Sequence, residues 1–336
     1  MKCSMVHHPF VMLVLLLLGS TVETIAQDLH FSQAPLHATF QNPALTGVFD
    51  GDWRASGHYR SQWETVPVQY RTGSAATDLK SRAIGKNGLA LGLLLAQDQA
   101  GDALLRWTQV GLQLSALHAL DKTQVLSAGF GLQGIQRSFD ASALKFNNQW
   151  DGDLFNPDLS SKEVLNNQSG IKASLSAGIN WHFQDPINRT KVDAGIAGFH
   201  LNRPSLHFKS DLPSELPRRM GAYVQAYLQR NEWLDWFFFT QYQQMGSARE
   251  VLSGTGVRYW LDDETALQLT GASRWKDALI PALQVQFRQW TVGLSYDVNY
   301  SPFKVATRRR GGFEVAVVYT SLPVKPIKDL KVCPTF

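Results

Sequence analysis

The sequence has only two cysteines in 336 residues, Cys3 and Cys333. Beyond the N-terminus it has no run of 18 apolar residues, which excludes a bundle of membrane-spanning helices, since each needs about 20. Charged residues make up only 18% of the chain, and the net charge of +4 is too small to predict a nucleic-acid partner. If Cys3 is removed with a leader, Cys333 has no partner for an internal disulfide.

The N-terminus has the features of an export signal. Lys2 gives a positive start, Val11–Leu18 is an apolar run, and Thr24-Ile25-Ala26 is a small-residue cleavage site. These features predict that residues 1–26 are a cleaved signal peptide and that the mature chain begins at Gln27.

The stretch Ile171–Phe183 alternates between apolar and polar residues without a break. Successive side chains of a strand point to opposite faces, so the pattern predicts one apolar and one polar face. Strands of globular proteins average about 5–6 residues, whereas a tilted membrane-spanning strand needs roughly 9–11. The length favours a membrane strand over a long strand of a secreted sandwich.

The same alternation recurs along the rest of the chain. We predict an all-β protein: a transmembrane antiparallel β-barrel of about 14 strands that spans residues 52–321. A secreted β-sandwich is the alternative. An even strand number suits a bacterial barrel made from one chain. The expected strands are 53–63, 69–79, 87–97, 104–118, 122–138, 168–183, 190–202, 217–230, 232–245, 249–261, 265–276, 280–288, 290–299 and 311–321.

The lengths of the connections also alternate. The long ones, residues 140–167, 203–216 and 300–310, are all odd-numbered along the chain, whereas the even-numbered ones are short. Membrane barrels have short periplasmic turns and longer external loops. We therefore expect residues 27–51 to be a periplasmic lead-in and residues 322–336 to be a periplasmic tail.

Six charged residues fall on the predicted inner face. They are either interior ion pairs that fill the barrel or the lining of a solute path. These residues are Arg60, Asp78, Lys172, Arg258, Asp297 and Glu314.

Few residues suggest chemistry. The acidic stretch Asp151–Asp158 has oxygen ligands of the kind calcium prefers, but it misses the EF-hand spacing and is interpreted as a solvated loop. His182, His200 and His207 lack metal-ligand spacing, so no metal or cofactor is predicted. No nucleophile motif occurs, and an enzyme is not expected. An outer-membrane hydrolase with a serine at the lumen edge remains a minor alternative.

Several short motifs resemble the PorP/SprF family over essentially the whole mature chain. They are Gln27–Gln33, Asn42–Gly47, Tyr59–Trp63, Tyr296–Ser301 and Gly311–Val315. Two positions depart from the family pattern. Leu29 replaces a common proline, and the chain ends Cys333-Pro334-Thr335-Phe336 where Cys-Pro-Arg is usual, which puts a tail contact in doubt.

The resemblance implies an outer-membrane barrel of the type IX secretion and gliding apparatus of Bacteroidetes. Such a barrel is expected to bind or anchor periplasmic secretion components or a secreted surface protein, with outer-membrane lipid around it. The alternative is a passive outer-membrane porin or uptake channel. The candidate partner-binding residues are Asn42, Pro43, Gly47, Arg60, Trp63, Asp297, Arg308, Arg309, Arg310 and Cys333.

Overall fold

A computed structural model gives the fold and describes residues 28–62, 70–81, 87–101, 103–140, 144–162, 169–206, 215–301 and 310–322. The expected signal peptide, the C-terminal tail with Cys333, and the candidate residues Trp63, Arg308 and Arg309 lie outside these ranges. In the described part of the chain, no helix is long and apolar enough to cross a membrane.

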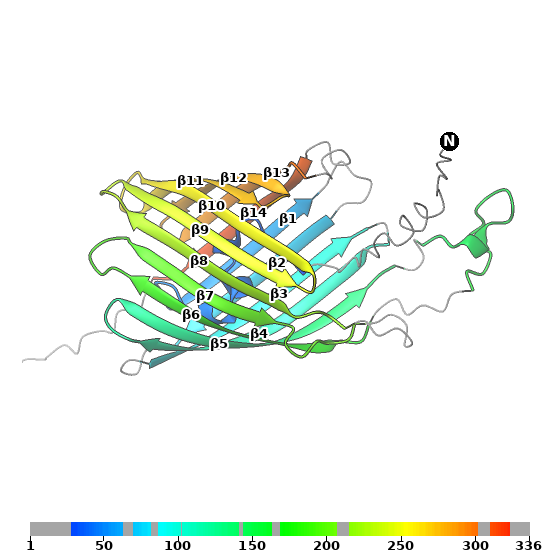
Figure 1. The fold of residues 1–336 in the computed structure, drawn as a ribbon, viewed down its shortest axis with the longest axis horizontal. Helices are drawn as coiled ribbons and strands as arrows, with labels where there is room; N and C mark the ends of the chain where they lie inside the picture. The colour runs from blue at the N-terminus through cyan, green and yellow to red at the C-terminus, as the bar shows by residue number, and fades with distance from the viewer. Residues whose placement is uncertain are drawn as a thin grey trace, which may run out of the picture.

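Within the described ranges, fourteen strands form one closed antiparallel barrel, in which β1 pairs with β14 (Figure 1). This confirms the predicted fold. The strands are 9 to 15 residues long, enough to cross a bilayer at a tilt. They are β1 (Trp53–Gln62), β2 (Tyr70–Lys80), β3 (Asn87–Ala100), β4 (Leu105–Ala119), β5 (Gln124–Ser138), β6 (Lys172–Gln184), β7 (Lys191–Phe199), β8 (Arg219–Gln229), β9 (Leu234–Met245), β10 (Ala248–Trp260), β11 (Thr265–Arg274), β12 (Ala278–Phe287), β13 (Trp290–Asn299) and β14 (Arg310–Thr320).

The outer wall is apolar, as the alternation predicts. On β3, Leu93 is 39% exposed, whereas its neighbour Leu94 points into the barrel and is 1% exposed. At one end of the wall, the Tyr319 ring centroid lies 4.9 Å from that of Trp53 and 4.8 Å from that of Trp290. Apolar side chains on the outside, flanked by aromatic rings, are typical of a wall in contact with lipid.

The two ends of the barrel differ. One end, here called the long-loop end, carries the β5–β6 connection (139–171) and the β7–β8 connection (200–218). The other, the short-turn end, carries turns such as 120–123 and 261–264 and the start of β1. A short 3-10 helix, η4 (Asn147–Gln149), lies in the β5–β6 connection.

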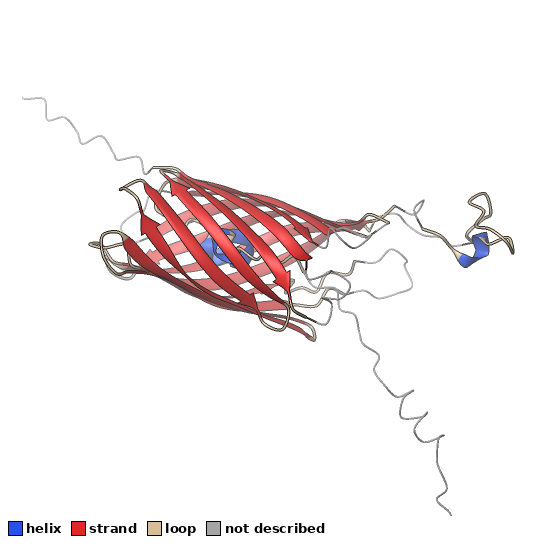
Figure 2. Ribbon diagram, turned by 90° about the horizontal axis from the view of Figure 1, so that it is seen from above, coloured by secondary structure: helices blue, strands red, loops and turns tan. Residues whose placement is uncertain are grey.

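Residues 28–52, called the plug from here on, run through the barrel lumen (Figures 1 and 2). Asp28 contacts His200, the first residue after β7, at the long-loop end, and Asp52 bonds to Ser321 beyond β14, at the short-turn end. The plug contains η1 (Ala34–Leu36), α2 (Ala38–Gln41) and η2 (Pro43–Leu45).

The position of the plug corrects the expectation that residues 27–51 are a lead-in outside the barrel. Phe31 and Phe40 of the plug pack with Ala76, Leu94 and Ala96 of the inner wall. Burying these apolar side chains inside the barrel removes them from water, which a solvated lead-in would not do.

Candidate functional site

The plug is fixed near the long-loop end by a carboxylate of the barrel wall. The backbone N–H groups of Ser32 and Gln33 donate to the two oxygens of Glu314, at 2.7 and 2.9 Å. The Gln33 side-chain amide also donates to the Glu314 carbonyl at 3.1 Å. Glu314 is 1% exposed, so this bidentate contact replaces the water that an ionised carboxylate needs.

Two arginines and a second carboxylate complete this cluster. Arg60 lies 2.7 Å from Asp297 and 3.2 Å from Glu314, and Arg274 lies 2.8 Å from Asp297. Both arginines also donate to the Ser32 hydroxyl, which in turn donates to Asp297 at 2.7 Å. The cluster therefore links β1, β11, β13 and β14 to one residue of the plug.

The middle of the plug lies against glycines of the wall. The Asn42 side-chain amide donates to the carbonyls of Ile179 and Ile196, at 3.0 and 3.2 Å. An added Cβ at Gly129 would lie 2.3 Å from the backbone of Ala44, and one at Gly178 would lie 2.0 Å from Asn42. Only glycine permits this approach of plug and wall.

Near the short-turn end, the plug is held by a second ion pair. The Gly47 N–H donates to Asp78 at 2.8 Å, and Arg54 forms a bidentate pair with the same carboxylate at 2.7–3.0 Å. Gly47 has φ +81°, and an added Cβ would lie 2.3 Å from Ala90. A residue with a side chain would be both strained and blocked there.

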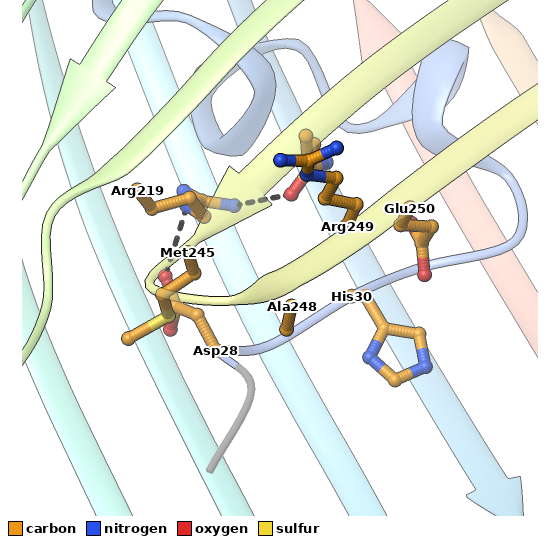
Figure 3. A pocket seen from close by; sticks show the side chains of 8 residues that line it. Asp28, His30, Arg219, Met245, Ala248, Arg249 and Glu250 are labelled. Carbon is orange, nitrogen blue, oxygen red and sulfur yellow. Dashed lines mark hydrogen bonds and ion pairs between the residues drawn. The ribbon is translucent and has the colours of Figure 1, made fainter. Parts of the chain in front are cut away.

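At the long-loop end, Asp28 begins the plug between His200 and Arg219. Its carboxylate lies 3.1 Å from each partner. Burial favours the neutral acid, but Arg219 and His200 outweigh it and hold the pKa of Asp28 below its usual value. Figure 3 shows Arg219 directed at Asp28, with His30 and Glu250 on the far side of a cavity of about 30 Å³. Burial lowers the pKa of His30 to about 4.

Asp28, His200 and Ser174 form a chain of hydrogen bonds. The Ser174 hydroxyl lies 2.8 Å from Nδ1 of His200, and Nε2 lies 3.1 Å from Asp28. The residue types match a hydrolase triad, the minor alternative left by the sequence. Ser174 is 0% exposed, however, so a substrate does not reach its hydroxyl in this conformation. Here the chain of bonds ties the start of the plug to β6.

The structure brings five of the predicted partner-binding residues together around the plug. Asn42, Pro43 and Gly47 belong to the plug itself, and Arg60 and Asp297 belong to the cluster that holds it. All are buried, so they contact other parts of the same chain rather than a surface open to a partner. Arg310 is exposed at the start of β14.

The predicted inward charges mostly form ion pairs. The ion pairs of Arg60, Asp78, Asp297 and Glu314 are described above. Arg258 forms a further pair, 2.7 Å from Asp235, which is 0% exposed. In the acidic loop, Asp151 accepts backbone N–H groups of Asp153 and Leu154, as expected for a turn. Among the described residues, no group of three or more His, Cys, Asp or Glu side chains is arranged to hold a metal.

Sequence reasoning missed Ser32, Gln33 and Arg274. Arg274 could have been predicted to point inward, because it lies an even number of residues from the inward-facing Gln268 and Thr270 on β11. The pair Ser32-Gln33 gave no local signal, because both bond to Glu314, about 280 positions later in the sequence.

The chain matches the family model described as "Type IX secretion system membrane protein PorP/SprF" over residues 23–319. No curated protein matches it. Among solved structures it is similar to the toluene transporter TbuX of Ralstonia pickettii (10% identity, 84% of this chain and 92% of that one, TM-score 0.48) and to a FadL homologue of Pseudomonas aeruginosa (10%, 84% and 93%, 0.49). It is also similar to the toluene transporter TodX of Pseudomonas putida (8% identity, 88% and 94%, TM-score 0.48).

Proposed function

Because the chain belongs to the PorP/SprF family of type IX secretion system membrane proteins, we propose that it is a binding component of the type IX secretion or gliding apparatus. The barrel and the family both point to the outer membrane. There the protein binds or anchors periplasmic secretion components or a secreted surface protein.

The observation that carries this proposal is the plug. It runs through the lumen and bonds to the wall near both ends and in the middle. A passive porin or uptake channel, the alternative function, needs an open lumen, and the plug occupies it. What remains for partners is the surface at the two ends of the barrel.

The β5–β6 connection is the candidate contact surface at the long-loop end. Its described part, residues 144–162, extends away from the barrel (Figure 2). It carries exposed apolar side chains, with Trp150 at 57% and Leu154 at 67% exposed. Exposed aromatic and apolar side chains are typical of protein contact sites.

Catalysis is not part of the proposal. The buried charged groups of the lumen are engaged with the plug or with each other, as in the pairs of Glu314 with Ser32 and of Asp235 with Arg258. Substituting Ser174 with Ala tests the hydrolase alternative. We expect unchanged lipid composition in cells that carry this variant, and altered lipid turnover would contradict a binding role.

Affinity purification of the tagged protein from detergent-extracted membranes tests the proposal. Mass spectrometry should identify periplasmic secretion components or an exported surface protein with the wild type. Deleting residues 144–162 should remove an exported partner, whereas replacing the short turn 261–264 with a Gly-containing turn should not. Recovery of neither class of partner with the folded wild-type protein would count against the proposed function.

A further inference from the structure

The outer wall of β11–β14 has a recess of about 510 Å³. Gly271 and Pro281 form its floor and are paired across β11 and β12. Leu269, Leu283 and Phe313, which are 39–61% exposed, line its sides. An added Cβ at Gly271 would meet nothing within 4 Å, so the wall lacks side-chain volume there.

The backbone at this place also departs from the rest of the barrel. Ile280 and Pro281 form no pairs with β13, although the residues on either side do. Proline has no N–H to donate, and it is rare inside a central strand for this reason. The β13–β14 ladder shifts register at Asp297 and Val298. The recess is therefore part of the backbone geometry rather than of one side-chain rotamer.

Positive charge lies above the recess, at the long-loop end. Arg310 pairs with Val298, whose side chain is on the outer wall, and Arg310 is itself exposed. It lies three residues before Phe313, about 10 Å along the strand. Lys276 is exposed in the β11–β12 turn at the same end, beside Trp275, which is 68% exposed.

We propose that this recess binds an acyl chain of a phosphorylated glycolipid of the outer leaflet, with Arg310 and Lys276 contacting its phosphate. The recess faces the hydrocarbon region, so an acyl chain reaches it directly. Guanidinium and ammonium groups bind phosphate, and a lipid phosphate lies just beyond its first acyl carbons. The long-loop end is the expected external face, where the outer leaflet lies. The inference rests on this orientation and not on the secretion role.

Native mass spectrometry of the delipidated full-length protein, titrated with lipid A or with phosphatidylethanolamine, tests the proposal. Gly271→Leu fills the recess, and Arg310→Gln removes the outward cation. Arg310→Gln should weaken lipid A binding about tenfold, the scale of one charged hydrogen bond. Gly271→Leu should also weaken it, because the new side chain takes the place of the acyl chain. Lipid A should bind the wild type more tightly than phosphatidylethanolamine does.

Two variants on the far wall are matched controls. Ala128→Leu adds the same side chain to the outer face of β5, and Arg106→Gln removes an outward arginine at the long-loop end of β4. Both should bind lipid A as the wild type does. Equal weakening in all four variants, no effect of Gly271→Leu and Arg310→Gln, or preference for phosphatidylethanolamine would overturn the proposal. So would a dimer of the chain that Gly271→Leu abolishes.

Discussion

At the scale of single residues, the plug depends on charges that have no access to water. Arg60, Arg274, Asp297 and Glu314 are each 1–4% exposed. Ser32 bonds to all four of these side chains through its hydroxyl and its backbone N–H, and Arg274 also pairs with Glu250 at 3.2 Å. Removing one partner of such a cluster leaves an uncompensated buried charge, which costs more than the loss of the contact itself.

Glu314→Gln tests this cluster. The neutral amide leaves Arg60 with one carboxylate fewer, and we expect a loss of about 3–5 kcal/mol in the free energy of unfolding. The measurement is the guanidinium unfolding midpoint of the protein folded in detergent micelles. The matched control is Glu264→Gln, since Glu264 pairs with Arg288 at 2.7 Å but both are more than half exposed. Its loss should be much smaller; equal losses would contradict the account.

Gly129→Ala tests the close approach of wall and plug. The new methyl group would lie 2.3 Å from the plug backbone, so plug or strand must shift. We expect a destabilisation of about 1–3 kcal/mol, typical of an overpacked core. Gly73→Ala on β2 is the control, because nothing lies within 4 Å of its added Cβ. A neutral effect of Gly129→Ala would mean that the plug does not lie against β5.

The start of the plug should respond to pH through His30. Its pKa of about 4 in the folded protein is below the usual 6.5, because burial opposes the charged form. The charged groups facing it are Glu250, Arg60, Arg274 and Asp297. The unfolded state therefore binds more protons, and stability is complete above pH 6.5 and falls between about 6.5 and 4.

Protease cleavage near residue 30, measured as a function of pH, tests this expectation. Cleavage should increase as the pH falls through that window in the wild type and change less in His30→Gln. Asp28 stays ionised throughout, since its pKa is also lowered. Cleavage that does not depend on pH, or that increases above pH 7, would contradict the lowered pKa of His30.

At the scale of elements, the strands could be predicted and the plug could not. Strand alternation is a local signal with a period of two residues, and all fourteen predicted strands are present, with ends shifted by a few residues. The turns at the short-turn end also have a local cause. Asp121, Asp185, Asn231 and Asp262 each accept N–H groups two and three residues later.

The plug lacks such a pattern. Its residues do not alternate, and their partners lie far away in the sequence: 137 positions separate Asn42 from Ile179, and 282 separate Ser32 from Glu314. The inward parity of Arg60, Asp297 and Glu314 is confirmed, and of the two interpretations left open these residues form the interior ion pairs. It did not show that a segment of the same chain lies between them. Alternation along a strand tells which face of the sheet a side chain is on, but not which residues lie opposite it.

At the scale of the whole molecule, two features define the barrel. The pairing of β1 with β14 leaves no free sheet edge, and the plug runs through the lumen. A lumen crossed by the protein's own chain leaves the two ends of the barrel as the surface for the proposed contacts. The described part of the β5–β6 connection, with exposed Trp150 and Leu154, is one such surface.

Planar-bilayer conductance tests whether the plug blocks the lumen. The intact protein should be silent, whereas a variant lacking residues 28–47 should keep its fourteen paired strands and conduct steadily. Deleting residues 144–162, a segment of nearly equal length outside the barrel, is the control and should leave the protein silent. A steady open pore in the intact protein would favour the porin alternative.

Hydrogen exchange of the plug amides decides whether residues 28–52 are held inside the barrel. In the folded protein in detergent, peptides spanning Ser32 and Gln33, whose N–H groups bond to buried Glu314, should exchange as slowly as those of the strands. Exchange of these amides within seconds, at the rate of an unstructured chain, while the strands stay protected, would contradict a plug held inside the barrel.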